Sequence, residues 1–200
     1  MKAHQILSAG ALTFAAVVAQ AAGPAYQAGT YNLDPMHSKV GFEVPHLVIS
    51  TVEGRFTKLG GDIQLGEKFE KSSVKVAVDT DSVDTGVAKR DDHLKSPDFF
   101  ESKKYPQMKF ESTEIAGTPE TFKLTGNLTI KNVTKKVTFE GKYLGTVKDG
   151  YGNEKAAFNA KTKINRKDYG LTWNNAVEAG PVVGDEVTID LKLQAAKAKK

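Results

Sequence analysis

The chain has 200 residues, a formal net charge of +4 at pH 7 and no cysteine. This small, dispersed excess of positive charge gives little support to nucleic-acid binding, which needs basic residues clustered on one face beside stacking aromatic side chains. The lack of cysteine excludes disulfides, so the fold depends on its hydrophobic core, and the length suits one core in one domain.

The N-terminal segment is typical of a secretory signal peptide. Lys2 precedes an apolar stretch from Ile6 to Val18, and Ala19-Gln20-Ala21 then supplies a cleavage site of the Ala-x-Ala type. The apolar stretch is shorter than the roughly 20 residues that a membrane-spanning helix needs. We therefore expect residues 1–21 to direct export and to be removed.

Apolar and polar side chains alternate with a period of two in most of the remaining sequence. Because successive side chains of a strand point to opposite faces, each such segment is a strand with one apolar face. The pattern is clearest in a hairpin formed by residues 121–130 and 136–143. The other segments with this pattern are 29–34, 38–46, 51–65, 71–79, 107–113, 158–164 and 187–193.

One predicted strand changes parity along its length. Val52 and Phe56 lie at even positions, whereas Ile63 and Leu65 lie at odd positions. Such a switch across Gly60-Gly61 indicates a bend or bulge at the glycine pair.

Residues 85–106 interrupt the strands with a short helical insertion. Thr85 is a plausible helix cap, and Ser96-Pro97 repeats the pattern of a helix start with proline at the first position. The insertion is too short to cover a sheet, but it can cap one end of a fold.

Eight or nine strands with one apolar face and almost no helix leave two architectures, a sandwich of two sheets or a barrel. Long strands in up-and-down order, with a bend in one of them, favour an all-β, antiparallel β-barrel of about eight strands. The interior of such a barrel is either filled by side chains or holds one small ligand.

Several motifs in the same order along the chain resemble the YceI family. They are Leu33-Asp-Pro-Met-His-Ser38, Phe42-x-Val-x-His46, Val52-x-Gly-x-Phe56, Ser82-Val-Asp-Thr-Gly86, Arg90-Asp-Asp-His-Leu94, Asp98-Phe-Phe100, Tyr105-Pro106, Gly126-x-Leu-Thr-Ile130 and Ile164-Asn-Arg166. The resemblance implies an extended, lipocalin-like, eight-stranded barrel in the periplasm. It further implies an apolar tunnel that holds a polyisoprenoid, an isoprenoid quinone or a similar long lipid, for transport or storage. With the resemblance, the chain divides into a signal peptide (1–21), a flexible lead-in (22–28), a YceI-like β-barrel domain (29–195) and a basic tail (196–200).

The candidate ligand-binding residues form two groups. The apolar residues expected to line the lumen are Val40, Phe42, Val44, Phe56, Val76, Phe99, Met108, Phe110, Leu128, Ile130, Phe139, Tyr143, Phe158 and Ile164. The polar residues expected at the mouth, on the family's motifs, are His37, Ser38, His46, Arg90, Asp92, His93 and Arg166. Of these, Arg90 and Arg166 would suit a phosphate.

Other interpretations stay open. The apolar residues also suit a packed core, and the polar ones a hydrogen-bond network that ties the insertion to the barrel rim. A structural or partner-binding barrel with a filled interior is the main alternative, although Gly126, Gly141 and Gly145 on the apolar face favour an open lumen.

Catalysis and metal binding find little support in the sequence. No Gly-x-Ser-x-Gly motif occurs, and Ser38 and His37 are adjacent in a predicted strand, so their side chains point apart. The histidines lack the spacing of a helical metal site. We therefore expect no enzyme activity, catalytic residue, metal or cofactor, and the expected partner is a lipid rather than nucleic acid. We expect no stable membrane insertion, and transient membrane contact and a homodimer both stay open.

Overall fold

The computed structural model describes residues 26–177 and 180–199. The predicted signal peptide lies outside the described residues. The strands are β1 (Gly29–Leu33), β2 (Lys39–His46), β3 (Ser50–Phe56), β4 (Leu59–Leu65), β5 (Ser73–Asp79), β6 (Val83–Asp84), β7 (Gln107–Thr118), β8 (Thr121–Ile130), β9 (Val133–Lys148), β10 (Glu154–Asn165), β11 (Ala176–Val177), β12 (Gly180–Pro181) and β13 (Glu186–Lys197). The helical elements are α1 (Ala88–Lys95) and the 3₁₀ helices η1 (Pro35–His37), η2 (Phe69–Lys71), η3 (Thr80–Ser82) and η4 (Arg166–Tyr169).

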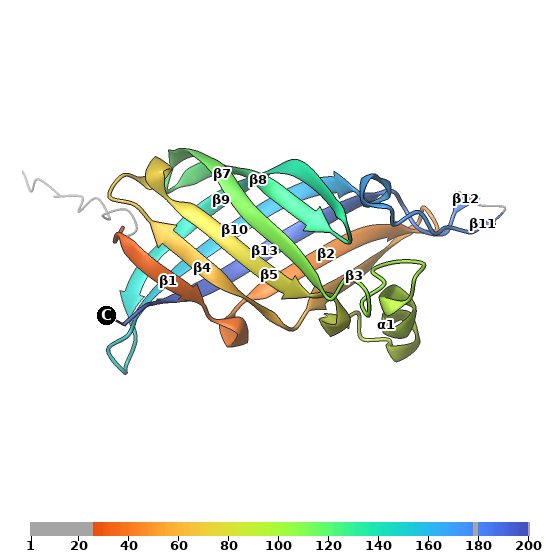
Figure 1. Ribbon diagram of the computed structural model, residues 1–200, viewed down its shortest axis with the longest axis horizontal. Helices are drawn as coiled ribbons and strands as arrows, with labels where there is room; N and C mark the ends of the chain where they lie inside the picture. The colour runs from red at the N-terminus through yellow and green to blue at the C-terminus, as the bar shows by residue number, and fades with distance from the viewer. Residues whose placement is uncertain (1–25, 178–179, 200) are drawn as a thin grey trace, which may run out of the picture.

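The strands form a closed antiparallel barrel (Figure 1). β1 and β2 pair with successive stretches of β13, through Leu33 opposite Ala195 and Val40 opposite Leu191, so together they act as one interrupted strand. β3 and β4 continue each other in the same way, because β3 pairs with β2 and β4 with β1. Counted in this way the barrel has eight strands in up-and-down order, which confirms the predicted all-β, lipocalin-like barrel.

The break between β3 and β4 lies earlier than predicted. It falls at Thr57 and Lys58, whose backbone N–H groups bond to the carbonyl and hydroxyl oxygens of Ser82, each at 3.1 Å. The predicted position at Gly60-Gly61 is therefore wrong. Gly61 has a different role: at its φ of 146° a Cβ would lie 2.1 Å from the carbonyl oxygen of Lys75, so glycine permits the close pairing of β4 with β5.

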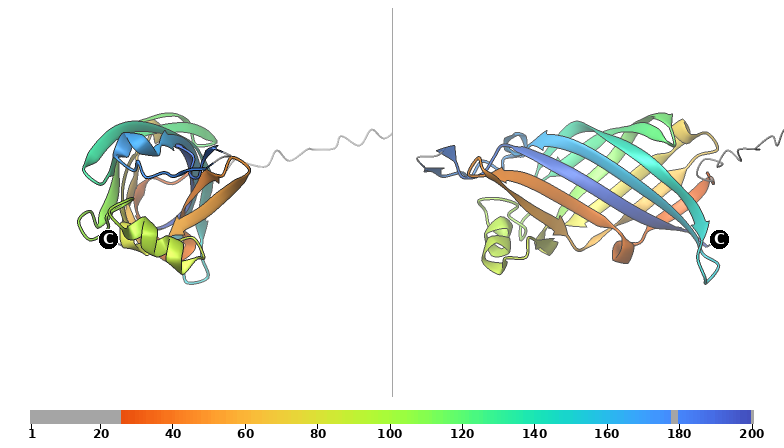
Figure 2. Two further views of the ribbon diagram at one scale, coloured as in Figure 1. Left: turned by 90° about the vertical axis from the view of Figure 1, so that its right-hand side faces the viewer. Right: turned by 180° about the vertical axis from the view of Figure 1, so that it is seen from behind.

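The helical insertion lies at one end of the barrel, as predicted (Figure 2). Its helix α1 begins at Ala88 rather than at Thr85, with Val87 as an N-cap that makes no side-chain bond. The predicted cap is wrong because the Thr85 hydroxyl donates instead to the Asp91 carboxylate, at 2.6 Å. The second predicted helix start, at Ser96-Pro97, is a turn.

Both ends of the predicted domain extend further than expected. Residues 22–25 of the predicted lead-in lie outside the described residues, but the Tyr26 hydroxyl donates to the carbonyl of Gly66 at 2.5 Å, and its ring packs against Phe69. At the other end, β13 continues to Lys197, two residues into the predicted tail. Tyr26 and Lys197 therefore belong to the barrel.

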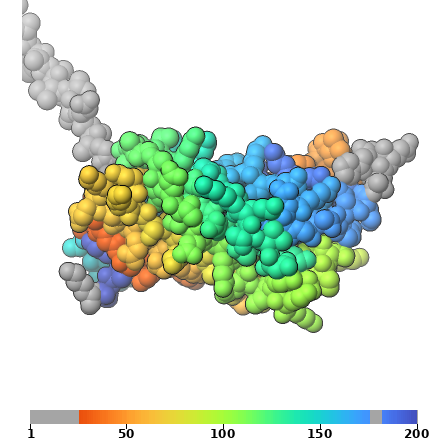
Figure 3. All heavy atoms as spheres, turned by 45° about the horizontal axis from the view of Figure 1, so that its top comes forward, coloured from red at the N-terminus to blue at the C-terminus, as the bar shows by residue number. Residues whose placement is uncertain are grey.

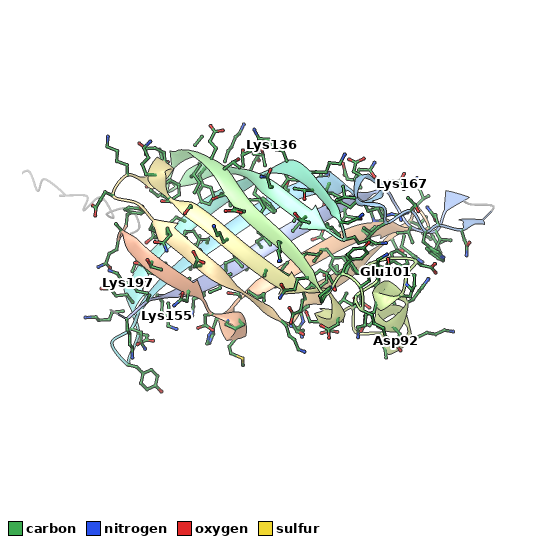
Figure 4. All side chains as sticks on the ribbon, in the orientation of Figure 1. Asp92, Glu101, Lys136, Lys155, Lys167 and Lys197 are labelled. Carbon is green, nitrogen blue, oxygen red and sulfur yellow. The ribbon has the colours of Figure 1, made fainter. Side chains whose placement is uncertain are left out.

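Charged side chains project from the outer surface of the barrel. Figure 4 shows Lys136, Lys155 and Lys197 on three strands, and Lys167 on η4, at the outside of the barrel. In the space-filling view of Figure 3, β7 and β8 lie across the outside of an elongated body. Among the described residues, no helix is both long and apolar enough to span a membrane.

Candidate functional site

An apolar cavity of about 350 Å³ lies inside the barrel. Its volume falls within the range of small-molecule binding sites, roughly 300–1,000 Å³. Leu128 of β8, Phe139 of β9 and Ala160 of β10 form part of its wall at mid-barrel, where strand alternation turns these side chains inward.

One end of the cavity is closed by aromatic side chains. The ring of Tyr143 packs against Tyr26 and Phe158, with centroid distances of 5.7 and 5.2 Å, and Phe69 packs against Phe122 at 5.3 Å. Tyr143 is only 2% exposed and does not contact the cavity. Its assignment to the lumen wall is therefore wrong, because this aromatic cluster fills the barrel at its level. Burial raises the pKa of the Tyr143 phenol, although its hydrogen bond with Thr146 opposes this shift.

The other end is open. Here the wall includes Val44 and Val52 of the β2–β3 hairpin and Trp173 of the chain after η4, all partly exposed, and the exposed Pro45. The helix α1 lies at this same end (Figure 2). The helix α1 and the β2–β3 hairpin together flank this opening, which we call the mouth.

Aromatic rings and a histidine form one side of the mouth. The His93 ring meets Trp173 and Phe99 edge-on, with centroid distances of 4.9 and 5.1 Å. The Nε2 atom of His93 lies 2.9 Å from a carboxylate oxygen of Asp98. This contact restrains the ring, so His93 lines the cavity beside two aromatic side chains while its Nε2 atom is paired.

Arg166 has a structural role. From the sequence alone, this role could not be distinguished from phosphate binding. The residue is 4% exposed, and its guanidinium donates to four carbonyl oxygens, those of Leu171, Trp173, Val183 and Gly184, at 2.6–3.2 Å. A fifth bond, at 3.4 Å, reaches Asp185. Since a guanidinium has five N–H donors, none is left for a ligand. Arg166 therefore lies at the cavity as predicted, but its hydrogen bonds within the protein do not support the expected phosphate contact.

Arg90 of α1 remains as a cation at the mouth. Its Nε donates to the Thr85 hydroxyl at 2.8 Å and one Nη to the Thr85 carbonyl at 3.1 Å. No ion pair links Arg90 to a carboxylate of the described residues, and its side chain lines the cavity. His46 also lines the mouth, at the end of β2, where its backbone pairs with Val183.

Three of the predicted mouth residues lie away from the cavity. His37 is largely exposed and contacts Asp34, with 3.0 Å between Nδ1 and the carboxylate. The Ser38 hydroxyl donates to the carbonyl of Gln194 at 3.1 Å and ties β2 to β13. Asp92 is on the outer side of α1 (Figure 4). None of the three contacts the cavity, so their predicted place at the mouth is wrong: His37 and Asp92 point to solvent, and Ser38 is used in the barrel wall.

The structure brings thirteen of the fourteen predicted apolar residues to the cavity wall. They are Val40, Phe42, Val44, Phe56, Val76, Phe99, Met108, Phe110, Leu128, Ile130, Phe139, Phe158 and Ile164. Strand alternation placed most of them, and it would also have found Leu124 and Leu191, which line the same wall. Trp173 and Leu94 could not be found in this way, because they come from a loop and a helix that have no period of two.

The glycines do not widen the lumen. A Cβ on Gly126 would lie 2.5 Å from the ring of Phe110, so this aromatic side chain already occupies the space above the glycine. Gly145, at a φ of 120°, lies beside the register shift between β9 and β10. The barrel does contain a cavity, but the small size of these glycines is not its cause, so the reason given for an open lumen is wrong.

In residues 26–177 and 180–199, no three His, Asp or Glu side chains converge in a way that could hold a metal ion. The two histidines at the mouth lie among apolar and aromatic neighbours. The arrangement is suited to binding an apolar molecule with a small polar end.

Comparison with known proteins places this architecture in a family. The UPF0312 protein of Serratia proteamaculans is 37% identical over 196 residues, which are 96% of each chain. Protein YceI of Escherichia coli O17:K52:H18 is 36% identical over 191 residues, 94% of this chain and 96% of its own length.

Solved structures share the fold. BcnA of Burkholderia cenocepacia aligns with a TM-score of 0.70 and 27% identity, over 82% of this chain and 99% of BcnA. The YceI protein of Campylobacter jejuni aligns with a TM-score of 0.68 and 30% identity, over 78% of this chain and 90% of its own. A polyisoprenoid binding domain from Saccharophagus degradans aligns with a TM-score of 0.63, over 86% of this chain and all of that domain, but at 17% identity this likeness is one of fold alone. Residues 31–195 match the YceI-like domain, and the chain therefore belongs to the YceI family.

Proposed function

We propose that this protein binds a polyisoprenoid, an isoprenoid quinone or a similar long-chain amphiphile, with the chain in the barrel cavity and the polar end at the mouth. The observation that carries the proposal is an apolar cavity closed by aromatic rings at one end and open at the other. A chain enters such a site lengthwise, so the polar end stays at the opening.

The driving force is the removal of apolar surface from water. Each Å² of apolar surface buried contributes about 25 cal/mol, so a long hydrocarbon chain binds with few polar contacts. Leu124, Leu128 and Phe139 offer it a wall without polar side chains at mid-barrel. Selectivity then depends on the length and width of the cavity more than on hydrogen bonds.

Arg90 is the residue that we assign to the head group. It lines the cavity, and two of its five N–H groups are bonded to Thr85 within the insertion. An anionic head, phosphate above all, would pair with its remaining donors. His46 lies at the same mouth and adds a polar contact.

The fold comparison supports the ligand class. The domain from Saccharophagus degradans is described as polyisoprenoid binding, so this barrel architecture is compatible with such a ligand in another protein. We further propose that the present chain is exported to the periplasm by residues 1–21 and acts as a carrier or store without catalysing a reaction.

The first experiment is to extract the native purified protein with organic solvent and to analyse the extract by mass spectrometry beside a buffer blank. A long-chain lipid in stoichiometric amount supports the proposal and identifies the ligand. A protein that carries no lipid, and that also fails to bind added geranylgeraniol, would favour a structural or partner-binding barrel. Trp173, the one tryptophan of the sequence, lines the mouth and reports binding by fluorescence.

A matched pair of variants tests the site itself. Ala160 lines the cavity, whereas Ala156, two inward positions earlier on β10, is fully buried and does not contact it. Ala160→Phe should abolish geranylgeraniol binding with little loss of stability, since the new ring enters empty space. Ala156→Phe should cost about 1–3 kcal/mol of folding free energy through overpacking. Equal destabilisation by both variants would mean that the interior is filled at Ala160 as well.

A further inference from the structure

The turn that joins β2 to β3 exposes apolar side chains beside the cavity mouth. It consists of Leu47, Val48 and Ile49, here called the 47–49 turn, and Val48 and Ile49 are 69% and 88% exposed. The β2–β3 hairpin reaches the end of the barrel where α1 lies (Figures 1 and 2).

The backbone of this turn is strained. Leu47 and Val48 have φ values of 50° and 65°, in the left-handed region that glycine and asparagine adopt easily and that a β-branched residue strongly disfavours. A hairpin turn selected only to reverse the chain takes residues such as Asn-Gly. Exposed apolar residues in a strained conformation therefore indicate a function for the side chains themselves.

The turn is continuous with the cavity wall and held firmly to it. Val44, His46 and Val52, which flank the turn on the two strands, all line the cavity. The backbone N–H of Leu47 donates to the carbonyl of Val182 at 3.0 Å, and the Ser50 hydroxyl donates to the carbonyl of His46 at 3.0 Å. Any surface that covers Val48 and Ile49 therefore lies next to the opening through which a ligand passes.

The size of this apolar surface points to a lipid bilayer rather than to a protein. A stable interface with a protein, or with a second copy of this chain, buries roughly 800 Å² on each partner. Two side chains at the tip of a hairpin supply much less than this area. They are enough, however, to enter the interfacial region of a membrane, where binding increases with the apolar area buried.

We propose that the 47–49 turn docks the mouth of the barrel on a phospholipid bilayer, with Val48 and Ile49 inserted between head groups. The proposal rests on the proposed function for its purpose: an isoprenoid chain then passes between bilayer and cavity without crossing water. Docking itself depends only on the turn, so it can be measured on the protein without a ligand.

The opposite end of the barrel provides a matched control. Val147 and Tyr151, near the β9–β10 loop, are 67% and 94% exposed, but the aromatic cluster of Tyr26, Tyr143 and Phe158 closes the cavity on that side. The two ends thus differ in access to the cavity and not in the presence of exposed apolar residues. If exposure alone caused membrane binding, both ends would bind.

The experiment uses two double variants. The first, called the 47–49 variant, carries both Val48→Ser and Ile49→Ser. The second, the control variant, carries both Val147→Ser and Tyr151→Ser. Each protein is floated with vesicles of phosphatidylethanolamine and phosphatidylglycerol, and its thermal unfolding is recorded. We expect the 47–49 variant to lower vesicle binding by roughly tenfold or more through loss of apolar burial, with unchanged unfolding. The control variant should bind as the unaltered protein does.

A second measurement separates this inference from the proposed function. Geranylgeraniol is offered either in dilute ethanol or in preloaded vesicles, and Trp173 fluorescence follows its uptake. Uptake from ethanol by the 47–49 variant, with slow uptake from vesicles, supports docking. Equal vesicle binding by all three proteins overturns docking even if geranylgeraniol binds. No uptake from either source, with docking retained, overturns the proposed function instead. Binding lost only in the control variant would also overturn the proposal, because it would place the docking surface at the closed end.

Discussion

Gly141 of β9 lies directly beneath the ring of Phe122 on β8. A Cβ on Gly141 would be 2.5 Å from both Cε2 and Cζ of that ring, and 2.9 Å from the carbonyl oxygen of Asn159. The ring therefore occupies the place of a side chain that the glycine lacks. Phe122 in turn packs against Phe69, so this pair helps to close the end of the cavity.

Gly141→Ala should destabilise the protein by about 1–3 kcal/mol, because the new methyl group forces the Phe122 ring out of its place. Gly60→Ala is the control, since a Cβ there meets no atom within 4 Å. Urea unfolding measures both variants. Equal stabilities would show that the Phe122 ring can move freely, and the aromatic closure of the cavity would then be looser than its geometry suggests.

Arg166→Lys should destabilise the protein by about 3 kcal/mol in the absence of any lipid. Lysine keeps the charge but cannot reach the four carbonyl oxygens that the guanidinium now satisfies, and buried carbonyls without donors are costly. Arg90→Lys, which loses two bonds to Thr85, should cost about 1 kcal/mol or less. A stable Arg166→Lys protein with weakened lipid binding would restore Arg166 as a ligand contact.

The lowered pKa of Asp34 leads us to expect a loss of stability in acid. Burial opposes its ionisation, but hydrogen bonds from Lys155 and His37 outweigh burial and lower its pKa from 3.8 to about 2. Because the pKa is lower in the folded protein, the carboxylate stabilises the fold above about pH 4, and this contribution disappears as the pH falls through 2. Asp34→Asn should therefore cost about 2 kcal/mol at neutral pH and nothing below pH 2.

Thermal unfolding of the Asp34→Asn protein across the acid range checks this expectation. Asp81→Asn, at an exposed position of η3, is the control and should follow the unaltered protein throughout. A deficit that stays constant from neutral pH down to pH 2 would mean that Asp34 acts through hydrogen bonds that do not depend on its charge.

The raised pKa of Tyr169 leads us to expect a loss of stability in alkali. Its side chain is 1% exposed, and its hydroxyl has no hydrogen-bond partner in the described part of the chain. Burial, with a smaller contribution from Asp168, raises the pKa of the phenol to about 12. The unfolded chain ionises first, so stability present below pH 10 is lost as the pH rises towards 12.

Tyr169→Phe should remove this alkaline loss and leave stability at neutral pH equal or higher by up to about 1 kcal/mol, since it deletes an unpaired buried hydroxyl. Chemical unfolding at neutral and alkaline pH measures both effects. A neutral-pH loss larger than 1 kcal/mol would show that the hydroxyl has a partner in solution.

Local patterns in the sequence determined the strands and their inward faces. The alternation in residues 121–130 is a direct consequence of strand geometry, and it placed Leu128 and Ile130 on the cavity wall correctly. The same rule misplaced Tyr143, because alternation tells which face a side chain occupies but not how far along the barrel the cavity extends.

Only the tertiary structure decided which inward side chains meet and which polar groups remain free. Arg166 and Arg90 are equally suited to phosphate by residue type. Four loop carbonyls, 5 to 18 residues further along the chain, and the Asp185 carboxylate nevertheless use the donors of Arg166. Whether an interior is hollow depends on the summed volumes of side chains from all eight strands, and a donor is free only if no acceptor reaches it in the folded chain. Neither property belongs to a segment of sequence, because both arise when the barrel closes.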